Sequence, residues 1–258
     1  MPHPLLDLTV PAVLGVFAQR LAWYVGLGLV ARRPASKSAV TVVVTCLSSK
    51  MGETFAFESS GESETMAHAD MLESVASFRP QPVEILYVCG GKTCRAFPDF
   101  GVVTLDGSVE IWEVKPERRS PSLVARLSVL AKALAEHGIP YRVRTPLWYR
   151  RQPHSANVRV LARHAGRPLP DSLASEVAAL VPPDRCLTLG EVRTRLGLAK
   201  PDICAAVARG ILAADIGSGF LGDTTVVRRP KPGARSGAYF PDEKGRAVPR
   251  PGRLIRPV

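Results

Sequence analysis

The chain has 258 residues, 46% of them hydrophobic, so it can form one large domain or two smaller ones with a sizeable core. Its 34 Lys and Arg outnumber its 23 Asp and Glu, and the formal net charge of +11 favours a polyanionic partner, nucleic acid before an acidic membrane surface. The five cysteines form no C-x-x-C pair and no His cluster accompanies them, which argues against a zinc site and indicates reduced thiols in a cytosolic protein.

Residues 1–37 are expected to form an N-terminal extension that is apolar at first and basic at its end. Gln19 and Arg20 interrupt the apolar stretch, so no run reaches the ~18–20 uncharged residues that a membrane span needs. No basic region precedes the stretch, which argues against a secretory signal. We therefore expect a helix packed on the domain or on a partner, and no association with a membrane.

Residues 38–165 are expected to form an α/β domain. We predict its first strand at AVTVVVTCL and a helix at ESSGESETMAHADMLESVASF, whose apolar residues recur at helical spacing. Further strands are predicted at VEILYV, at CRAFPDFGVVTL after a turn at Gly90-Gly91, and at SVEIWEVK after a hairpin turn at Asp106-Gly107. The domain is completed by a helix over SLVARLSVLAKALAEHG, a strand at YRVRT and the segment NVRVLARHAG. The apolar residues with the period of the first helix are Met66, Ala69, Leu72, Val75 and Ala76.

Residues 168–229 are expected to form a small helical domain. Two helices are predicted at TLGEVRTRLG and AKPDICAAVARGIL, joined by a short turn around Gly197, and this is the helix-turn-helix pattern. A further helix precedes them at DSLASEVAAL, and ADIGSGFLGDTTVVRR can form a two-stranded wing, so the domain is expected to be winged-helix-like. A protein-docking helical bundle would show the same pattern. In the DNA-binding interpretation, the phosphate contacts come from Lys200, Arg209, Arg228 and Arg229.

Residues 230–258 are a tail rich in Pro, Gly and Arg, which cannot bury enough apolar area to fold alone. A tail of this composition can bind nucleic acid as a basic arm, become ordered on a partner, or have no role. The sequence does not choose among these three.

Three charged residues stand in or beside the hairpin strands that turn at Asp106-Gly107. Counting from the turn places Asp99 and Glu113 close together on neighbouring strands, and Lys115 shares one strand face with Glu113. Two carboxylates this close repel unless a cation neutralises them. Mg²⁺ suits such a pair, because one or two carboxylates and the phosphate oxygens of a substrate can hold it. With Lys115 to orient or deprotonate water and to stabilise charge on a phosphate, the hairpin predicts metal-dependent phosphodiester hydrolysis.

This arrangement, Pro-Asp followed after a spacer by Glu-x-Lys on a strand, is the PD-(D/E)xK nuclease pattern. The alternative is a surface hairpin whose Glu and Lys face solvent, but Ile111, Trp112 and Val114 indicate a strand that is buried on its other face. Nucleases of this class usually carry a further acidic residue on a helix before the hairpin. The candidates there are Glu58, Glu62, Glu64, Asp70 and Glu73, whereas His68 is expected to be a surface or packing residue.

Five short motifs follow one another along the chain. They are Glu58-Ser59-Ser60-Gly61-Glu62, Gln81-Pro82, Pro98-Asp99-Phe100, Glu113-Val114-Lys115-Pro116 and the segment from Asn157 to His164. In this order they resemble the E-S-x-x-E, Q-P, P-D-F, E-V-K-P and N-x-x-x-L-x-R-(Y/H) elements of TnsA-type transposon-end endonucleases. The resemblance covers about residues 30–165, and the combination is far more specific than any single motif.

The resemblance implies a fold and a set of site residues. The fold would be a restriction-endonuclease-like mixed sheet with flanking helices, followed by a winged-helix-like domain. Glu62 is selected as the helix carboxylate because it closes the E-S-x-x-E element, and Glu64 is the second choice. Asp99, Glu113 and Glu62 would bind Mg²⁺, or Mn²⁺ in its place, and Lys115 would position the attacking water.

Residues 60–63 depart from the family pattern. They read Ser-Gly-Glu-Ser, where the family usually has apolar residues before the Glu and a basic residue after it. Gly61 is also a poor helix former near the start of a predicted helix. This departure is consistent with a divergent copy of reduced activity.

TnsA-like proteins are endonuclease subunits of a heteromeric transposase. They cut the 5′ ends of the element in double-stranded DNA, while a DDE-type transposase subunit cuts and joins the 3′ ends and an AAA+ ATPase regulator connects both to target choice. The resemblance therefore implies these partners and a location on the nucleoid in the bacterial cytoplasm. Two other functions would use the same residues: a stand-alone restriction or repair-type nuclease, and a DNA-binding assembly subunit that has lost turnover.

Overall fold

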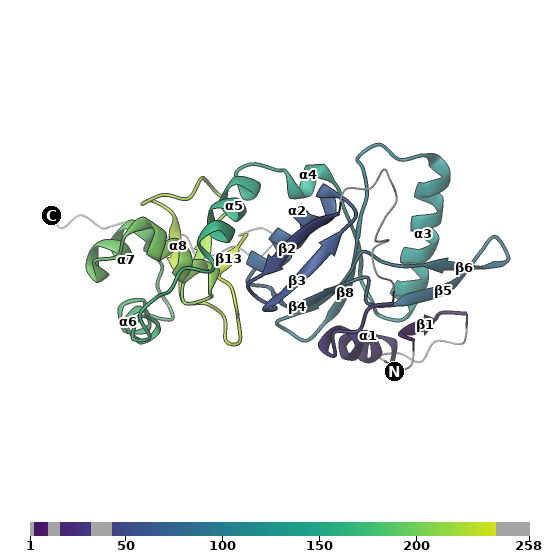
Figure 1. Cartoon of the computed structure of the whole chain (residues 1–258), viewed down its shortest axis with the longest axis horizontal. Helices are drawn as coiled ribbons and strands as arrows, with labels where there is room; N and C mark the ends of the chain where they lie inside the picture. Colours follow the sequence, from purple (N-terminus) through teal and green to yellow (C-terminus); the bar gives the residue numbers. More distant parts are fainter. Residues whose placement is uncertain (1–2, 10–15, 32–42, 241–258) are drawn as a thin grey trace. The chain divides into compact units, whose positions relative to one another are not determined.

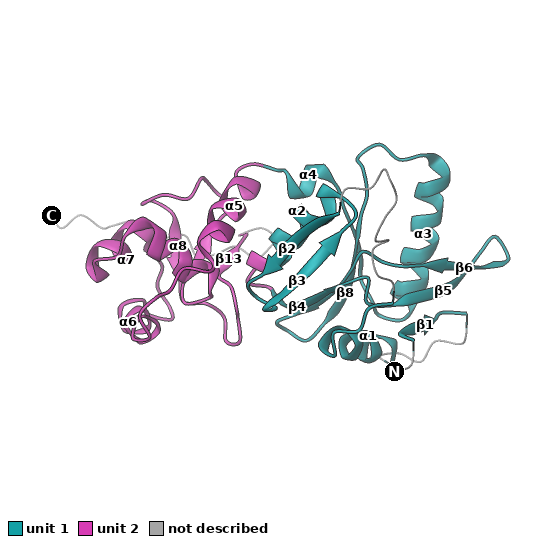
Figure 2. Cartoon of the chain, viewed as in Figure 1, with its two compact units in different colours: residues 1–69, 75–151 teal, residues 70–74, 152–258 magenta. Residues whose placement is uncertain are grey.

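The chain divides into two compact units (Figures 1 and 2). The computed structural model describes residues 3–9, 16–31 and 43–240. Unit 1 consists of residues 1–69 and 75–151, and unit 2 of residues 70–74 and 152–258.

This division differs from the predicted boundaries in two places. The sequence predicts residues 1–37 as an extension, yet the described part of this segment folds into unit 1. Residues 152–165 are predicted at the end of the α/β domain but fold with unit 2, because helix α5 (His154–His164) packs on helix α8 (Lys200–Ala208).

The central element of unit 1 is a mixed four-stranded sheet. Its strands lie in the order β4 (Val75–Pro80), β7 (Phe100–Thr104), β8 (Val109–Val114) and β9 (Tyr141–Arg144). The first three strands run antiparallel, whereas β9 runs parallel to β8 after helix α3 (Pro121–Glu136). Mixed α/β architecture is therefore confirmed, and it is compatible with a nuclease fold.

One face of this sheet packs on helices α1 (Val16–Gly26) and α3. A second sheet adjoins this core, with β1 (Leu5–Asp7) parallel to β5 (Glu84–Cys89) and β6 (Lys92–Ala96) antiparallel to β5. The N-terminal apolar residues thus form core and not an extension, which agrees with the predicted packed helix. The buried members of this core are Leu6, Phe17, Leu21, Tyr24, Val25, Val83, Ile85, Tyr87, Val109, Ile111, Leu130, Leu134 and Ile139.

The other side of unit 1 contains the hairpin of β2 (Val44–Ser48) and β3 (Glu53–Phe57), helix α2 (Ser60–Met71) and the short helix α4 (Pro146–Tyr149). The hairpin is joined to the main sheet by aromatic rings. These rings belong to Phe55, Phe57, Phe78 and Phe100, with centroids 5.7 to 6.5 Å apart between neighbours.

In this region one predicted helix was too long and one strand was missed. The helix predicted over residues 58–78 ends at Met71, and Val75 begins strand β4. A β-bulge between Val75 and Ser77 breaks the alternation of β4, so its apolar residues imitate a helical period. Strand β3 was not predicted at all.

The described part of unit 2 combines four helices with a small sheet. Its helices are α5, α6 (Leu173–Leu180), α7 (Leu189–Leu196) and α8, and its strands lie in the order β10 (Leu187–Thr188), β12 (Val226–Arg228), β11 (Ala213–Asp215) and β13 (Ala238–Tyr239). A capping box between Thr188 and Glu191 starts α7, and Gly197, with a φ of 63°, ends it. The predicted pair of helices around Gly197 is therefore present.

The first part of the predicted tail is ordered within unit 2. Ala238 forms a parallel bridge with Leu72, and the Ala238 carbonyl accepts a hydrogen bond of 2.7 Å from the Glu73 backbone N–H. Residues that cannot fold alone thus gain backbone partners from the 70–74 segment. Residues 241–258, which carry the rest of the tail prediction, lie outside the described residues.

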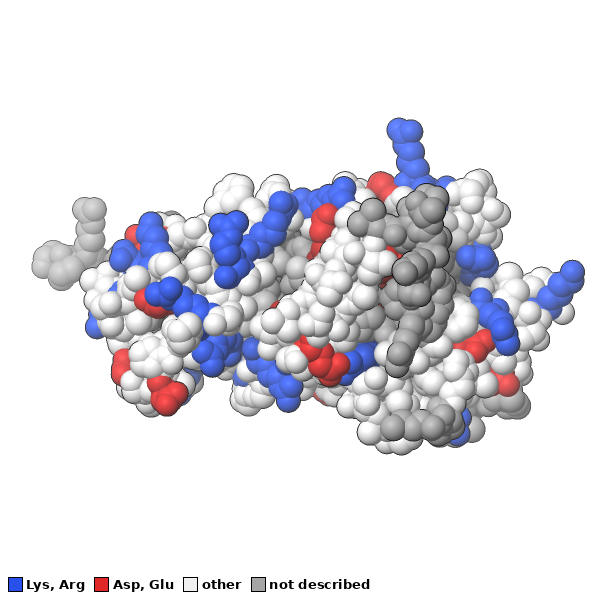
Figure 3. Space-filling view, viewed as in Figure 1, with Lys and Arg blue, Asp and Glu red and all other residues white. Residues whose placement is uncertain are grey.

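On the face shown in Figure 3, Lys and Arg side chains are spread over both units, with fewer Asp and Glu among them. The five cysteines, all within the described residues, are free thiols. Among the described helices, none combines the length and the apolar character that crossing a bilayer requires.

Candidate active site

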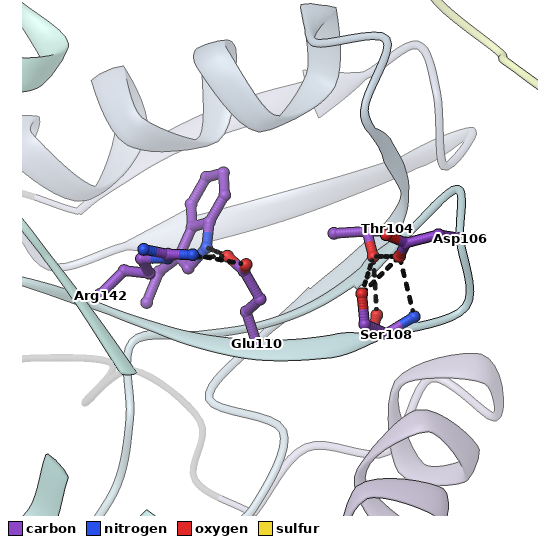
Figure 4. A network of polar contacts seen from close by, with 6 residues as sticks. Thr104, Asp106, Ser108, Glu110 and Arg142 are labelled. Atoms are coloured by element: carbon purple, nitrogen blue, oxygen red, sulfur yellow. Dashed lines mark hydrogen bonds and ion pairs between the residues drawn. The ribbon is translucent and has the colours of Figure 1, made fainter. Parts of the chain in front are cut away.

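The β7–β8 hairpin sets the geometry of the site. Asp106 accepts hydrogen bonds from Thr104 and from Ser108, and Gly107 turns the chain with a φ of 80° (Figure 4). Glu110, further along β8, accepts from Arg142 of β9 at 3.2 Å. These contacts fix the strand register on both sides of β8.

Asp99, Glu113 and Lys115 lie together at one end of this hairpin. Phe100 pairs with Trp112, so continuing the register by one residue places Asp99 opposite Glu113. The Lys115 Nζ lies 2.6 Å from Glu113 Oε1 and 3.5 Å from Asp99 Oδ2. Asp99 directly precedes β7 and Lys115 directly follows β8, so only Glu113 occupies a strand position. The predicted proximity of the three side chains is present in the structure.

Two backbone hydrogen bonds hold Asp99. The Val114 N–H donates to Asp99 Oδ2 at 2.6 Å, and the Gln81 N–H donates to the Asp99 carbonyl at 2.9 Å. Gln81 adopts a φ of 42°, an uncommon conformation for a residue other than glycine. The Gln81-Pro82 motif thus positions the backbone of Asp99.

Glu62 lies in the first turn of α2. Its carboxylate accepts hydrogen bonds from Ser59 Oγ at 2.9 Å and from the Glu58 N–H at 3.2 Å, while its own N–H donates to Ser59 Oγ. Burial and then the negative charge of Asp99 raise the pKa of Glu62. The side chain is therefore within electrostatic reach of Asp99, and the same contacts cap the helix.

Gly61 has a packing reason to be a glycine. A Cβ at this position would lie 2.8 Å from the Tyr149 Oη and 3.1 Å from the Val114 Cγ1. The absence of a side chain therefore lets the first turn of α2 approach the end of β8, beside Glu113 and Lys115. The departure of residues 60–63 from the family pattern is explained at this position by close packing.

Two of the other acidic candidates, Glu64 and Glu73, have partners elsewhere. Glu64 pairs with Arg150 at 2.9 Å, and Glu73, which belongs to unit 2, pairs with Arg228. His68 is buried, lies 2.9 Å from the Tyr149 carbonyl through Nε2 and packs on Trp148, as expected of a packing residue.

The site holds more negative charge than Lys115 neutralises. Burial, then the charge of Asp99, raises the pKa of Glu113 to about 7, although Lys115 acts in the opposite direction. Burial lowers the pKa of Lys115, but the charges of Glu113 and Asp99 outweigh this effect and raise it overall. Lys115 thus pairs with the two carboxylates of Asp99 and Glu113, while Glu62 is a third carboxylate within electrostatic reach of Asp99.

The donor set suits a hard divalent cation. Within the described ranges, no three His, Cys, Asp or Glu side chains are already gathered as a metal cluster. Mg²⁺ nevertheless needs only one or two carboxylates, because water and substrate phosphate complete its coordination. The facing oxygens of Asp99 and Glu113, with excess negative charge around them, fit that requirement.

The predicted DNA-binding residues of unit 2 fall into two pairs. Lys200, the first residue of α8, and Arg209, which directly follows this helix, are exposed. Arg228 donates to Glu73 at 2.9 Å and lies over the Tyr239 ring, with 4.2 Å between the guanidinium carbon and the ring centroid. Arg229 donates to the carbonyls of Ala178, in the last turn of helix α6, and of Val181, which directly follows this helix. These contacts indicate a structural role for Arg228 and Arg229.

The sequence did not identify Tyr141 as a neighbour of Glu113. It also did not predict that Tyr149 packs beside Gly61, at the start of α2. Tyr141 is opposite Ile111 in the β8–β9 pairing and so lies on the sheet face of Glu113. No local pattern marks it, because a parallel register depends on how α3 returns the chain to the sheet. The glycine at position 61 is the sequence signal that could have pointed to close packing beside Tyr149.

A mixed sheet with Asp99, Glu113 and Lys115 at the end of a hairpin defines the class as a nuclease of the PD-(D/E)xK superfamily. Residues 72–146 match the family model "TnsA-like endonuclease N terminal", so this part of the chain is similar to the N-terminal domain of TnsA-like endonucleases, which supports a TnsA-type endonuclease. The resemblance inferred from the motifs is thereby confirmed; the matched segment includes these three residues but not Glu62. No curated protein matches the chain.

Proposed function

We propose that this chain is a divalent-metal-dependent DNA endonuclease subunit of a heteromeric transposase, which hydrolyses the phosphodiester at the 5′ ends of a transposon. The observation that carries the proposal is the facing pair of Asp99 and Glu113 with Lys115 between them, inside the TnsA-like segment.

The site residues divide the chemistry among themselves. Asp99, Glu113 and Glu62 would hold Mg²⁺ or Mn²⁺, and such a cation supplies charge neutralisation and Lewis acidity at the phosphate. Lys115 has a raised pKa, so it is protonated at neutral pH. It therefore acts as a donor that orients the attacking water and stabilises charge on the phosphate, and not as the base that removes a proton.

Unit 2 is proposed to bind DNA. The order of α6, β10, α7 and α8, followed by the antiparallel pair β11 and β12, supports the proposal that unit 2 is winged-helix-like. The exposed Lys200 and Arg209 would contact phosphates of the duplex. The partners of the whole chain would be a DDE-type transposase subunit and an AAA+ regulator, on the nucleoid of a bacterial cytoplasm.

The test is cleavage of a duplex that carries the ends of the element encoding the chain, labelled at its 5′ strands. We expect nicks at the 5′ ends only when the chain, the transposase subunit encoded beside it and Mg²⁺ or Mn²⁺ are all present. Cleavage of plain duplex DNA by the isolated chain would indicate a stand-alone nuclease. Failure to cut with all components present would indicate an assembly subunit without turnover.

A further inference from the structure

Tyr141, the first residue of β9, carries a hydroxyl that is buried and has no hydrogen-bond partner among the residues that the structure describes. Buried polar groups in folded proteins are almost always hydrogen-bonded, and an exception at a functional site calls for an explanation. A hydroxyl that lacks a partner in the free protein can gain one when the site is loaded.

The position of Tyr141 in the sheet connects it to the candidate active site. Tyr141 pairs with Ile111 of β8, and Glu113 follows two residues later on the same face of that strand. The tyrosine side chain is thus a diagonal neighbour of Glu113, a spacing that aromatic and long side chains can bridge.

Tyr141 can act there only as a hydrogen-bond donor to an anion. Burial, then the negative charges of Glu113 and Asp99, raises its pKa, so the phenol stays protonated at neutral pH. Glu113 accepts hydrogen bonds from the Lys115 ammonium group, which lies 2.6 Å from its Oε1, and from the Asp99 backbone N–H. Tyr141 lies on the same sheet face as Glu113 and can add a further donor to this carboxylate.

We propose that Tyr141 is a positioning residue whose hydroxyl donates to the Glu113 carboxylate when the site takes up a divalent cation. This inference rests on the proposed function. Lys115 cannot keep both carboxylate contacts when a cation of the same sign shares them, because like charges repel. A donor on the same face then fixes the orientation of Glu113, as carboxylates that bind metals are themselves usually hydrogen-bonded.

The test compares Tyr141→Phe with a matched control, Tyr239→Phe. Tyr239 also has a buried hydroxyl without a hydrogen-bond partner in the described part of the chain, but it belongs to unit 2 and the charges that act on it are those of Arg228, Asp215 and Glu73. Both variants keep the aromatic ring. Three quantities are measured for each: the melting temperature in chelator, the shift of that temperature with Mn²⁺, and cleavage with the transposase subunit.

We expect Tyr141→Phe to melt at or above the wild-type temperature in chelator, because no hydrogen bond is lost. Its apparent Mn²⁺ affinity and its cleavage rate should fall by about tenfold or more, while Tyr239→Phe behaves like wild type. The inference is overturned if Tyr141→Phe melts lower in chelator, or if its Mn²⁺ response and cleavage are unchanged. If the wild type neither cuts nor responds to Mn²⁺, the proposed function fails first and the inference falls with it.

Discussion

Asp99 contributes a hydrogen bond and a charge to the site, and the two can be separated. Its Oδ2 accepts from the Val114 N–H at 2.6 Å, which holds the end of β8 beside the start of β7. Its charge raises the pKa of both Glu113 and Glu62. An asparagine can keep the hydrogen bond through its carbonyl oxygen, but it removes the charge.

Asp99→Asn should therefore keep the fold and lose cleavage. We expect the cleavage rate to fall by about 100-fold or more, since a metal site contributes several kcal/mol to stabilisation of charge. The melting temperature should stay close to that of wild type. Asp99→Ala is the control, because it also leaves the Val114 N–H without an acceptor and should cost a further ~1–3 kcal/mol of stability. Cleavage by Asp99→Asn at the wild-type rate would contradict the catalytic assignment.

Glu113 should make the stability of the metal-free chain depend on pH. Its pKa is about 7 in the folded chain, against an ordinary value of 4.5, so between these pH values the folded state holds a proton that the unfolded state has released. Stability therefore falls as the pH rises through this window. The loss amounts to roughly 3 kcal/mol between the two ends of the window.

Glu113→Gln removes this titration, so its stability relative to wild type should rise between pH 5 and pH 8, measured by denaturant unfolding in chelator. Glu110→Gln on the same strand is the matched control. Burial raises the pKa of Glu110, but its hydrogen bonds with Arg142 and Trp112 outweigh burial and lower the pKa overall. Glu110 is thus ionised in both states across this range, and its variant should show a constant difference. Parallel pH profiles for Glu113→Gln and wild type would contradict the raised pKa.

At the scale of elements, the approach of helix α2 to the end of β8 decides where Glu62 lies. Gly61 permits this close approach, because a Cβ at position 61 would lie only 2.8 Å from the Tyr149 Oη and 3.1 Å from the Val114 Cγ1. The first turn of α2 can therefore not carry a side chain at this position without moving.

Gly61→Ala should move Glu62 away from Asp99 and lower cleavage by about tenfold to 100-fold, since small displacements of catalytic groups have effects of this size. Its stability should change little, because the better helix propensity of alanine, ~1 kcal/mol, offsets part of the clash. Adding Tyr149→Phe removes the nearer of the two contacts and should restore most of the activity. Tyr149→Phe alone serves as the control with near wild-type cleavage. If the double variant is no better than Gly61→Ala, the Tyr149 contact is not the cause.

Local signals in the sequence predicted the elements that local interactions determine. The Asp106-Gly107 turn fixes the β7–β8 register, so the closeness of Asp99 and Glu113 could be read from counting alone. Helix α3 was likewise predicted from its own residues, with Gly138, which has a φ of 72°, just beyond its end. These features needed no knowledge of distant parts of the chain.

The features that the sequence did not predict depend on tertiary contacts. Strand β3 is only five residues long, and it is held by pairing with β2 and by the packing of Phe55 and Phe57 on Phe78 and Phe100. The face of Tyr141 depends on a parallel register set across α3. Arg228 and Arg229 looked like phosphate contacts because their partners, Glu73 and the carbonyls at the end of α6, are distant in sequence.

At the scale of the whole molecule, the net charge of +11 favours DNA binding, and the structure separates arginines with internal partners from those without. Arg118 and Arg119 follow Lys115 by three and four residues; Arg118 is exposed and Arg119 is half-buried, and neither has an ion-pair partner among the described residues. They can therefore contact phosphates next to the scissile bond. In unit 2 the exposed candidates are Lys200 and Arg209, although Arg209 also donates to the Arg167 carbonyl at 3.4 Å.

The variants Arg118→Ala/Arg119→Ala and Lys200→Ala/Arg209→Ala should each weaken duplex binding and flatten its salt dependence. Every lost phosphate contact lowers the slope of log K against log salt by about 0.9, so each double variant should lose up to about 2. Arg228→Ala should instead destabilise the chain by roughly 3–5 kcal/mol, because it leaves the buried Glu73 without its partner. Binding titrations over a range of salt concentrations, with thermal melts of the same proteins, distinguish the two effects. A salt slope unchanged in Arg118→Ala/Arg119→Ala would show that this loop does not contact DNA. A lowered salt slope in an Arg228→Ala variant that still folds would show that Arg228 does contact DNA.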